Sequence, residues 1–97
     1  MRFKIFGLAT IIDIPTEEFN SLTEDFISNG WVKKSEYAGF DAWIDYGFMK
    51  LKKNSIVLKF EWDIYGEGSI EGPINTITKI AKEFGYSVHS ANRWDLN

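Results

Sequence analysis

The clearest pattern in the chain is a nearly regular alternation of apolar and charged positions between residues 56 and 65. Successive residues of a β-strand point to opposite faces, so a strand over this range has one apolar face and one largely charged face. The apolar positions are Ile56, Leu58, Phe60, Trp62 and Ile64, and the alternate positions are Val57, Lys59, Glu61 and Asp63. The pattern predicts a strand that is buried on one face only.

Two other segments repeat apolar residues at helical spacing. The first follows Pro15, with Thr16 as the expected cap, and ends at Asn29-Gly30. The second opens at Gly72-Pro73 and closes at Gly85. The apolar stripes are Phe19, Leu22, Phe26 and Ile27 in the first segment and Ile74, Ile77, Ile80, Ala81 and Phe84 in the second. Each segment is therefore predicted to be a helix with one buried face.

The remaining apolar segments are typical of strands. Residues 2–13 are apolar on both faces, which favours a central strand. Residues 42–52 form a long candidate strand, and residues 86–91 form the last one. Whether residues 31–37 add a separate strand is left open by the pattern.

A turn at Lys53-Asn54 would join the strand over 42–52 to the alternating strand, because Asn tolerates a positive φ. The inner side then pairs Leu51 with Ile56, Met49 with Leu58, Gly47 with Phe60 and Trp43 with Ile64. The outer side pairs Phe48 with Lys59, Tyr46 with Glu61 and Ile44 with Asp63. This register directs the carboxylate of Asp45 inward, opposite Trp62.

The order of elements predicts an α+β fold. We expect a ferredoxin-like split βαβ sandwich, with an antiparallel sheet, two helices on one face and an optional added strand over 31–37. Gly66 to Gly72 is interpreted as a loop that leads from the alternating strand to the second helix. The 97 residues fit one domain, residues 1–97.

The composition is sufficient for a hydrophobic core that needs no disulfide bonds. Hydrophobic residues make up 44% of the chain, aromatic residues 16%, and cysteine is absent. The short apolar run near the N-terminus is interpreted as part of the first strand rather than a signal peptide, and no run approaches the roughly 20 apolar residues of a membrane span. We expect a cytoplasmic protein with no membrane contact.

Charge is segregated along the chain, although the net charge is only −3. Residues 13–45 carry eight acids against two lysines, residues 50–59 carry four lysines, and residues 61–71 carry four acids. Binding to nucleic acid needs a basic footprint, so direct nucleic-acid binding is not expected. A basic protein partner fits better, while the alternative reading is that these blocks are solvated faces without a partner.

No catalytic or metal-binding motif is present in the sequence. His89 is the only histidine, and no glycine-framed nucleophilic serine accompanies it. One histidine and no cysteine argue against a zinc site. The glycines between Gly66 and Gly72 resemble a phosphate loop only superficially, because Glu67 and Glu71 would repel an anion. We expect no enzymatic activity, no metal and no cofactor.

Aromatic residues provide the strongest candidate site. The hairpin register places Tyr46 and Phe48 on the outer face, among charged side chains. Aromatic anchors inside a charged rim are typical of protein interfaces. The candidate partner-binding residues are Tyr46, Phe48, Lys59, Glu61, Asp63, Glu67 and Glu71. A homodimer through the same face is an open alternative.

Three stretches carry a resemblance to a known family: Glu61-Trp62-Asp63, residues 67–73 (EGSIEGP) and residues 80–86 (IAKEFGY). Together with the small size and acidic charge, they resemble the immunity proteins of bacterial contact-dependent growth inhibition and related polymorphic toxin systems. This resemblance implies a cytoplasmic inhibitor that binds a basic, nuclease-type toxin domain and covers its active site or substrate groove.

A second function class remains open at this point. A ferredoxin-like dimeric ligand-binding protein, or a small enzyme, would use a pocket between the sheet and the helices. Its expected lining is Trp43, Trp62, Tyr65 and His89. A purely structural interaction module is a third reading.

Overall fold

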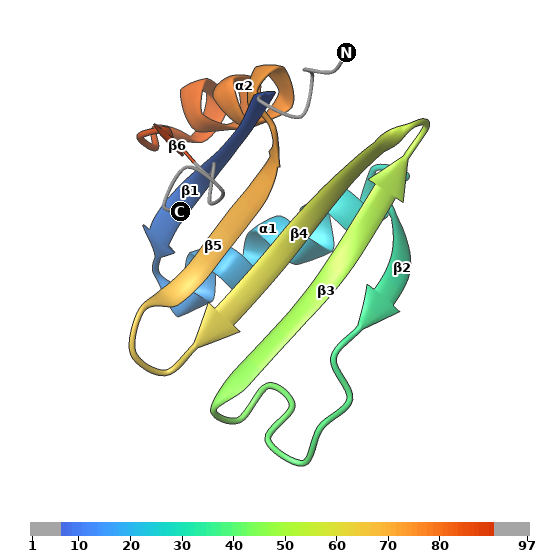
Figure 1. Cartoon of the computed structure of the whole chain (residues 1–97), viewed down its shortest axis with the longest axis vertical. Coiled ribbons are helices and arrows are strands. Elements are labelled where there is room, and N and C mark those ends of the chain that lie inside the picture. Colours follow the sequence, from blue (N-terminus) through green and yellow to red (C-terminus); the bar gives the residue numbers. More distant parts are fainter. Residues whose placement is uncertain (1–6, 91–97) are drawn as a thin grey trace, which may run out of the picture.

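The computed structural model describes residues 7–90 and confirms the α+β class (Figure 1). The elements are β1 (Leu8–Ile14), α1 (Thr16–Ser28), β2 (Val32–Glu36), β3 (Tyr46–Lys53), β4 (Ile56–Asp63), β5 (Glu67–Pro73), α2 (Ile74–Phe84) and β6 (His89–Ser90). All strand pairs are antiparallel, in the order β2-β3-β4-β5-β1-β6. Residues 2–6 of the predicted first strand and residue 91 of the last lie outside the described residues.

The largest difference from the sequence-based expectation is β5. The segment interpreted as a loop is a strand that pairs with β4 on one side and with β1 on the other. Its glycines are buried: Gly68 lies under the ring of Phe19 and Gly72 under the side chain of Leu58, and an added Cβ at either position would clash. Here glycine permits close packing rather than a turn.

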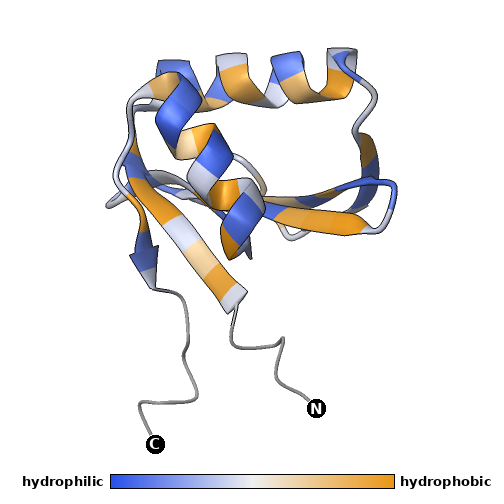
Figure 2. Cartoon of the chain, turned by 90° about the horizontal axis from the view of Figure 1, so that it is seen from above, coloured by the Kyte–Doolittle hydropathy of each residue, from blue (hydrophilic) through white to orange (hydrophobic). Residues whose placement is uncertain are grey.

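Both helices lie on the same side of the sheet, and the other side carries no helix (Figure 2). We call these the covered face and the open face. The covered face supplies the core, in which the largest fully buried side chains are Phe60, Ile11, Ile14, Leu51, Leu58, Ile70 and Ile77. Within residues 7–90 no polar or charged residue is buried. Burial of apolar area therefore holds the two layers together.

The helix boundaries match the sequence signals closely. The second helix follows Pro73 and ends at Gly85, which adopts the left-handed conformation with φ 82°. The first begins at Thr16, but Thr16 does not cap it; its hydroxyl instead accepts a hydrogen bond from Trp62. The outermost stripe positions were wrong, since these side chains remain exposed at the margins of the helix–sheet contact. They are Ile27, Ile74 and Phe84.

The β3–β4 hairpin differs from the expected register by two residues. Its turn is formed by Asn54 and Ser55, with Asn54 at φ 58°, so Lys53 pairs with Ile56. Leu51 then lies opposite Leu58, Met49 opposite Phe60 and Gly47 opposite Trp62. An even shift leaves the side chains of the paired residues on their predicted faces. Ile64, predicted on the inner side, instead follows the end of β4 and is exposed.

The shorter β3 corrects two residues of the predicted strand. Asp45 precedes β3 and is exposed, so its carboxylate does not point into the core. Trp43 lies in the β2–β3 connection rather than opposite Ile64. Residues 32–36 do form a separate edge strand, and the last strand is short. Neither helix is long and apolar enough to span a membrane, within residues 7–90.

Candidate protein-binding face

The open face brings all seven predicted partner-binding residues together. Alternation along three neighbouring strands places them on the side without helices. They are Tyr46 and Phe48 on β3, Lys59, Glu61 and Asp63 on β4, and Glu67 and Glu71 on β5. The direct cross-strand neighbours are Tyr46 and Asp63, Phe48 and Glu61, Asp63 and Glu67, and Lys59 and Glu71. The expected pairs on the outer side are therefore replaced by these, because of the register shift.

Three aromatic rings pack together on this face. The ring centroids of Tyr37 and Tyr46 are 5.1 Å apart at an interplanar angle of 76°, and those of Tyr37 and Phe48 are 5.9 Å apart. The ammonium of Lys59 lies 5.2 Å from the Phe48 centroid, within the range of a cation–π contact. Tyr37 was absent from the predicted site. It follows β2 directly, and its amide donates to the Phe48 carbonyl at 2.9 Å.

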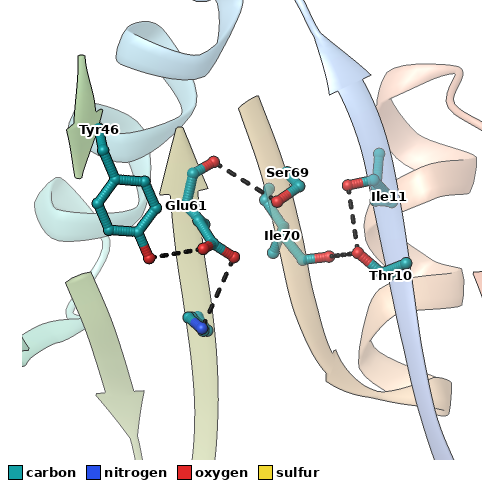
Figure 3. A network of polar contacts seen from close by, with 7 residues as sticks. Thr10, Ile11, Tyr46, Glu61, Ser69 and Ile70 are labelled. Atoms are coloured by element: carbon teal, nitrogen blue, oxygen red, sulfur yellow. Dashed lines mark hydrogen bonds and ion pairs between the residues drawn. The ribbon is translucent and has the colours of Figure 1, made fainter. Parts of the chain in front are cut away.

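A band of polar contacts crosses the open face perpendicular to the strands (Figure 3). The hydroxyl of Tyr46 donates to Oε2 of Glu61 at 2.6 Å, and Nζ of Lys59 lies 3.6 Å from Oε1 of the same carboxylate. Farther along, Ser69 donates to the Glu61 carbonyl at 3.5 Å, and Thr10 donates to the Ile70 carbonyl at 3.0 Å. These contacts connect β3 to β1, so the surface is ordered before any partner arrives.

Two tyrosines of the aromatic group have raised pKa values. Burial, followed by the hydrogen bond to Glu61, raises the pKa of Tyr46 to about 12. The hydrogen bond to Asp41, at 2.6 Å, raises the pKa of Tyr37. Both hydroxyls therefore stay protonated at neutral pH and act as donors to carboxylates. The rings remain available as neutral anchors.

The four carboxylates of the predicted site fall into two groups. Asp63 accepts from the amides of Tyr65 and Gly66 at 2.8 and 2.6 Å and so holds the β4–β5 turn, while Glu61 is engaged as described. Glu67 and Glu71 have no hydrogen-bond or ion-pair partner among the described residues. These two are the carboxylates that are free to receive a cation from outside.

The acidic end of the open face is hollowed. A depression of about 250 Å³ beside the β4–β5 turn is lined by Asp13, Glu61, Asp63 and Glu67, together with Ile12, Gly66, Gly68 and Ser69. Asp13 was expected in a separate acidic block, but an irregularity in β1, with Asp13 at φ 58°, brings it here. No group of side chains within residues 7–90 is arranged to hold a metal ion.

The opposite end of the face is basic. Lys50 lies directly across from Lys59, and Lys52 follows toward the hairpin tip. Lys53 is not part of this end, because its ammonium donates to the Asn29 carbonyl at the end of α1, at 2.9 Å. Acidic and basic ends therefore lie along the same strands, and Tyr46 and Phe48 of β3 lie between Asp63 at the acidic end and Lys50 at the basic end. A partner that approached with a basic surface would be oriented toward the β4–β5 turn.

The expected pocket between sheet and helices is present in part. Trp43 and Trp62 both line a cavity beside α1. Tyr65 is not in it, since its side chain is 92% exposed at the β4–β5 turn. His89 is also outside it: it lies on the edge strand β6, opposite Thr10. The histidine and the two indoles therefore do not form one site.

Comparison with known proteins gave no match to a family model, to a curated protein or to a solved structure.

Proposed function

We propose that this chain is a protein-binding inhibitor of the immunity-protein kind, which docks the open face of its sheet on a basic, nuclease-type toxin domain. Binding there would cover the active site or the substrate groove of the toxin. The proposal assigns no reaction, metal or cofactor to the chain, and places it in the cytoplasm, where such a toxin acts.

The observation that carries the proposal is the composition of the open face. Tyr37, Tyr46 and Phe48 supply ordered aromatic surface, and aromatic residues dominate the binding energy of many interfaces. The unpartnered carboxylates of Glu67 and Glu71 lie on the same face two strands away, on β5, with β4 between them and the rings. A basic surface complements these charges, and such complementarity raises the association rate and disfavours wrong partners.

We also propose that the fold is a ferredoxin-like sandwich whose sheet has two additional strands. The units β1-α1-β2 and β5-α2-β6 correspond to its two split βαβ halves, and the β3–β4 hairpin is inserted between β5 and β2. The inserted hairpin carries Tyr46, Phe48, Lys59, Glu61 and Asp63. Most of the proposed binding surface therefore belongs to the insertion.

The test is a binding and neutralisation experiment with the protein encoded by the adjacent reading frame. Its C-terminal domain should form a complex with this chain, and co-expression should relieve the toxicity of that domain. The variant Tyr46→Ala with Phe48→Ala should weaken the complex at least about a hundredfold, because two anchors at about 2 kcal/mol each are removed. Ile27→Ala, which truncates an exposed apolar residue on α1, serves as the control.

Two results would overturn the proposal. One is a complex whose affinity is unchanged by the double variant although the variant is folded. The other is a chain that only self-associates, with sedimentation showing a dimer that Tyr46→Ala and Phe48→Ala dissociate, because the open face would then be a homodimer interface.

A further inference from the structure

A cavity of about 370 Å³ lies between α1 and the covered side of β3 and β4. It is on the opposite side of the sheet from the open face, so the proposed protein partner does not reach it. Its walls come from the helix, from the two strands and from the β2–β3 connection. The lining residues are Thr16, Phe19, Asn20, Thr23, Trp43, Met49 and Trp62.

The indole of Trp43 is held in the cavity wall by its surroundings. Its ring lies against Gly47, where any Cβ would clash with it, so only glycine leaves room. The backbone of Trp43 has φ 60°, an unfavourable value for a bulky residue. Its amide donates to the Tyr46 carbonyl at 2.7 Å, and its Nε1 donates to Glu36 at 2.6 Å. The position of this ring is therefore defined by backbone and side-chain contacts together.

Both indole N–H groups of the cavity are already used by the protein. Nε1 of Trp43 bonds Glu36, and Nε1 of Trp62 donates to the hydroxyl of Thr16 at 2.9 Å. An occupant would therefore contact the carbon atoms of the two indole rings, the ring of Phe19 and the thioether of Met49. No charged residue is among the lining residues, so a charged occupant would lose hydration without gaining a counter-charge.

A few polar groups lie at the margin of the cavity. The side-chain amide of Asn20 has no hydrogen-bond partner within the described part of the chain, and it is exposed. The hydroxyl of Thr23 donates to the Phe19 carbonyl at 2.9 Å, which leaves its oxygen free to accept. In small-molecule sites, apolar and aromatic walls supply most of the affinity, and a few polar groups orient the ligand. Asn20 and Thr23 can orient a ligand in this way.

We propose that this cavity binds a neutral, planar aromatic molecule of one or two fused rings, stacked against Trp43 and Trp62 and oriented by a hydrogen bond to Asn20. The volume lies at the lower end of the range of roughly 300 to 1,000 Å³ for small-molecule sites, which limits the occupant to that size. The indole and phenyl walls select an aromatic ligand. The uncharged lining excludes an ionised one.

A pair of fluorescent probes tests the ring and the charge requirement together. 2-Naphthylamine is neutral at pH 7 and has two fused rings, and 6-aminonaphthalene-2-sulfonate carries the same rings with a sulfonate. The neutral probe should bind saturably at one site, with energy transfer from tryptophan. The sulfonate should bind at least about tenfold more weakly, because its charge has no counter-charge in the cavity. Equal or tighter binding of the sulfonate would contradict the proposal.

Two matched substitutions locate the bound probe. Thr23→Phe fills the cavity from α1 and should reduce affinity for the neutral probe at least about tenfold. Thr78→Phe makes the same change at an exposed position of α2 that lines no described cavity, and should leave affinity unchanged. If both variants bind the probe equally well, the probe does not occupy this cavity.

An NMR spectrum of the native chain tests the proposal even if Thr23→Phe does not fold. On titration with the neutral probe, the indole N–H signals of Trp43 and Trp62 should shift while that of Trp31, which packs against Phe26, should not. Shifts confined to Trp31, or no saturable shift, would overturn the proposal. A second pair of results would also overturn it: the native chain binds no probe, and Trp43→Ala loses toxin binding. The cavity would then hold a side chain of the protein partner.

Discussion

The two faces of the sheet are built from the same strands and differ in almost every physical property. On β4, Leu58 and Phe60 are fully buried under the helices, while their neighbours Lys59 and Glu61 are part-exposed and bonded to each other. The covered face gains its stability from apolar burial, whereas the open face is ordered by hydrogen bonds and ring contacts that do not need a covering layer. The difference leaves the open face available for recognition without loss of the core.

The largest expected effect comes from truncating one ring on each face. Phe60→Ala should lower the free energy of unfolding by about 3 to 5 kcal/mol, because it leaves a cavity among fully buried neighbours. Phe48→Ala should lower it by about 1 kcal/mol or less, because only cross-strand contacts on a half-open surface are lost. Urea unfolding of both variants measures the two values. Equal losses would show that the faces are not energetically distinct.

A smaller effect should follow from adding a methyl group beneath α1. Gly68→Ala places a Cβ against the ring of Phe19 and should cost about 1 to 3 kcal/mol through overpacking. Gly66→Ala is the matched control on the same β4–β5 connection, where an added Cβ meets only Asp63 Oδ1 at 3.7 Å. Thermal unfolding should show a lower midpoint for the first variant alone. A stable Gly68→Ala would mean that the helix does not rest on this strand.

Alkaline pH should affect one tyrosine on each side of the sheet. The pKa of Tyr46 is raised to about 12, mainly by burial and then by Glu61; the pKa of Tyr86 is also raised to about 12, by burial and by its hydrogen bond to Glu18. An unfolded tyrosine has a pKa of about 10. The stabilisation from each group is therefore complete below pH of about 10 and lost as pH rises toward about 12.

Removing the Tyr46 hydroxyl should reduce the loss of stability at alkaline pH. Tyr46→Phe should lower stability at pH 7 by about 1 to 2 kcal/mol, because a hydrogen bond to a charged group is removed, and should reduce the fall in stability between pH of about 10 and 12. Tyr65→Phe, at a nearly fully exposed side chain, should do neither. Urea unfolding as a function of pH provides the measurement. An unchanged alkaline slope in Tyr46→Phe would contradict the assigned hydrogen bond.

The sequence predicts the faces of the hairpin better than its register. Alternation of polar and apolar residues survives a shift of two positions, so Tyr46, Phe48 and Glu61 are on the predicted face although their partners differ. The turn residue itself was ambiguous, since Asn54 can occupy either position of a two-residue turn. Pattern therefore determines the side of a strand, while the turn determines the pairing.

The parts that could not be predicted depend on contacts between distant segments. In the sequence, Gly68 and Gly72 indicate a loop. Only the contacts with Phe19 and Leu58, which are distant in the chain, explain why glycine is needed in a strand there. Asp13 reaches the acidic depression only through the irregularity in β1. Trp43 joins a cavity wall because the β2–β3 connection folds over Gly47. None of these arrangements leaves a periodic signal along the chain.

The most direct test of the proposed role of the open face is the kinetics of binding to the toxin domain at two ionic strengths. Tyr46→Ala should mainly raise the dissociation rate, because an anchor is lost. Glu67→Lys with Glu71→Lys should mainly lower the association rate and weaken its salt dependence, because these carboxylates attract the basic partner. Glu24→Lys with Glu83→Lys makes the same change in net charge on the helices and should alter neither rate by more than about twofold. If the helix pair slows association while the open-face variants leave both rates within about twofold, the partner binds the helices and the central claim is wrong.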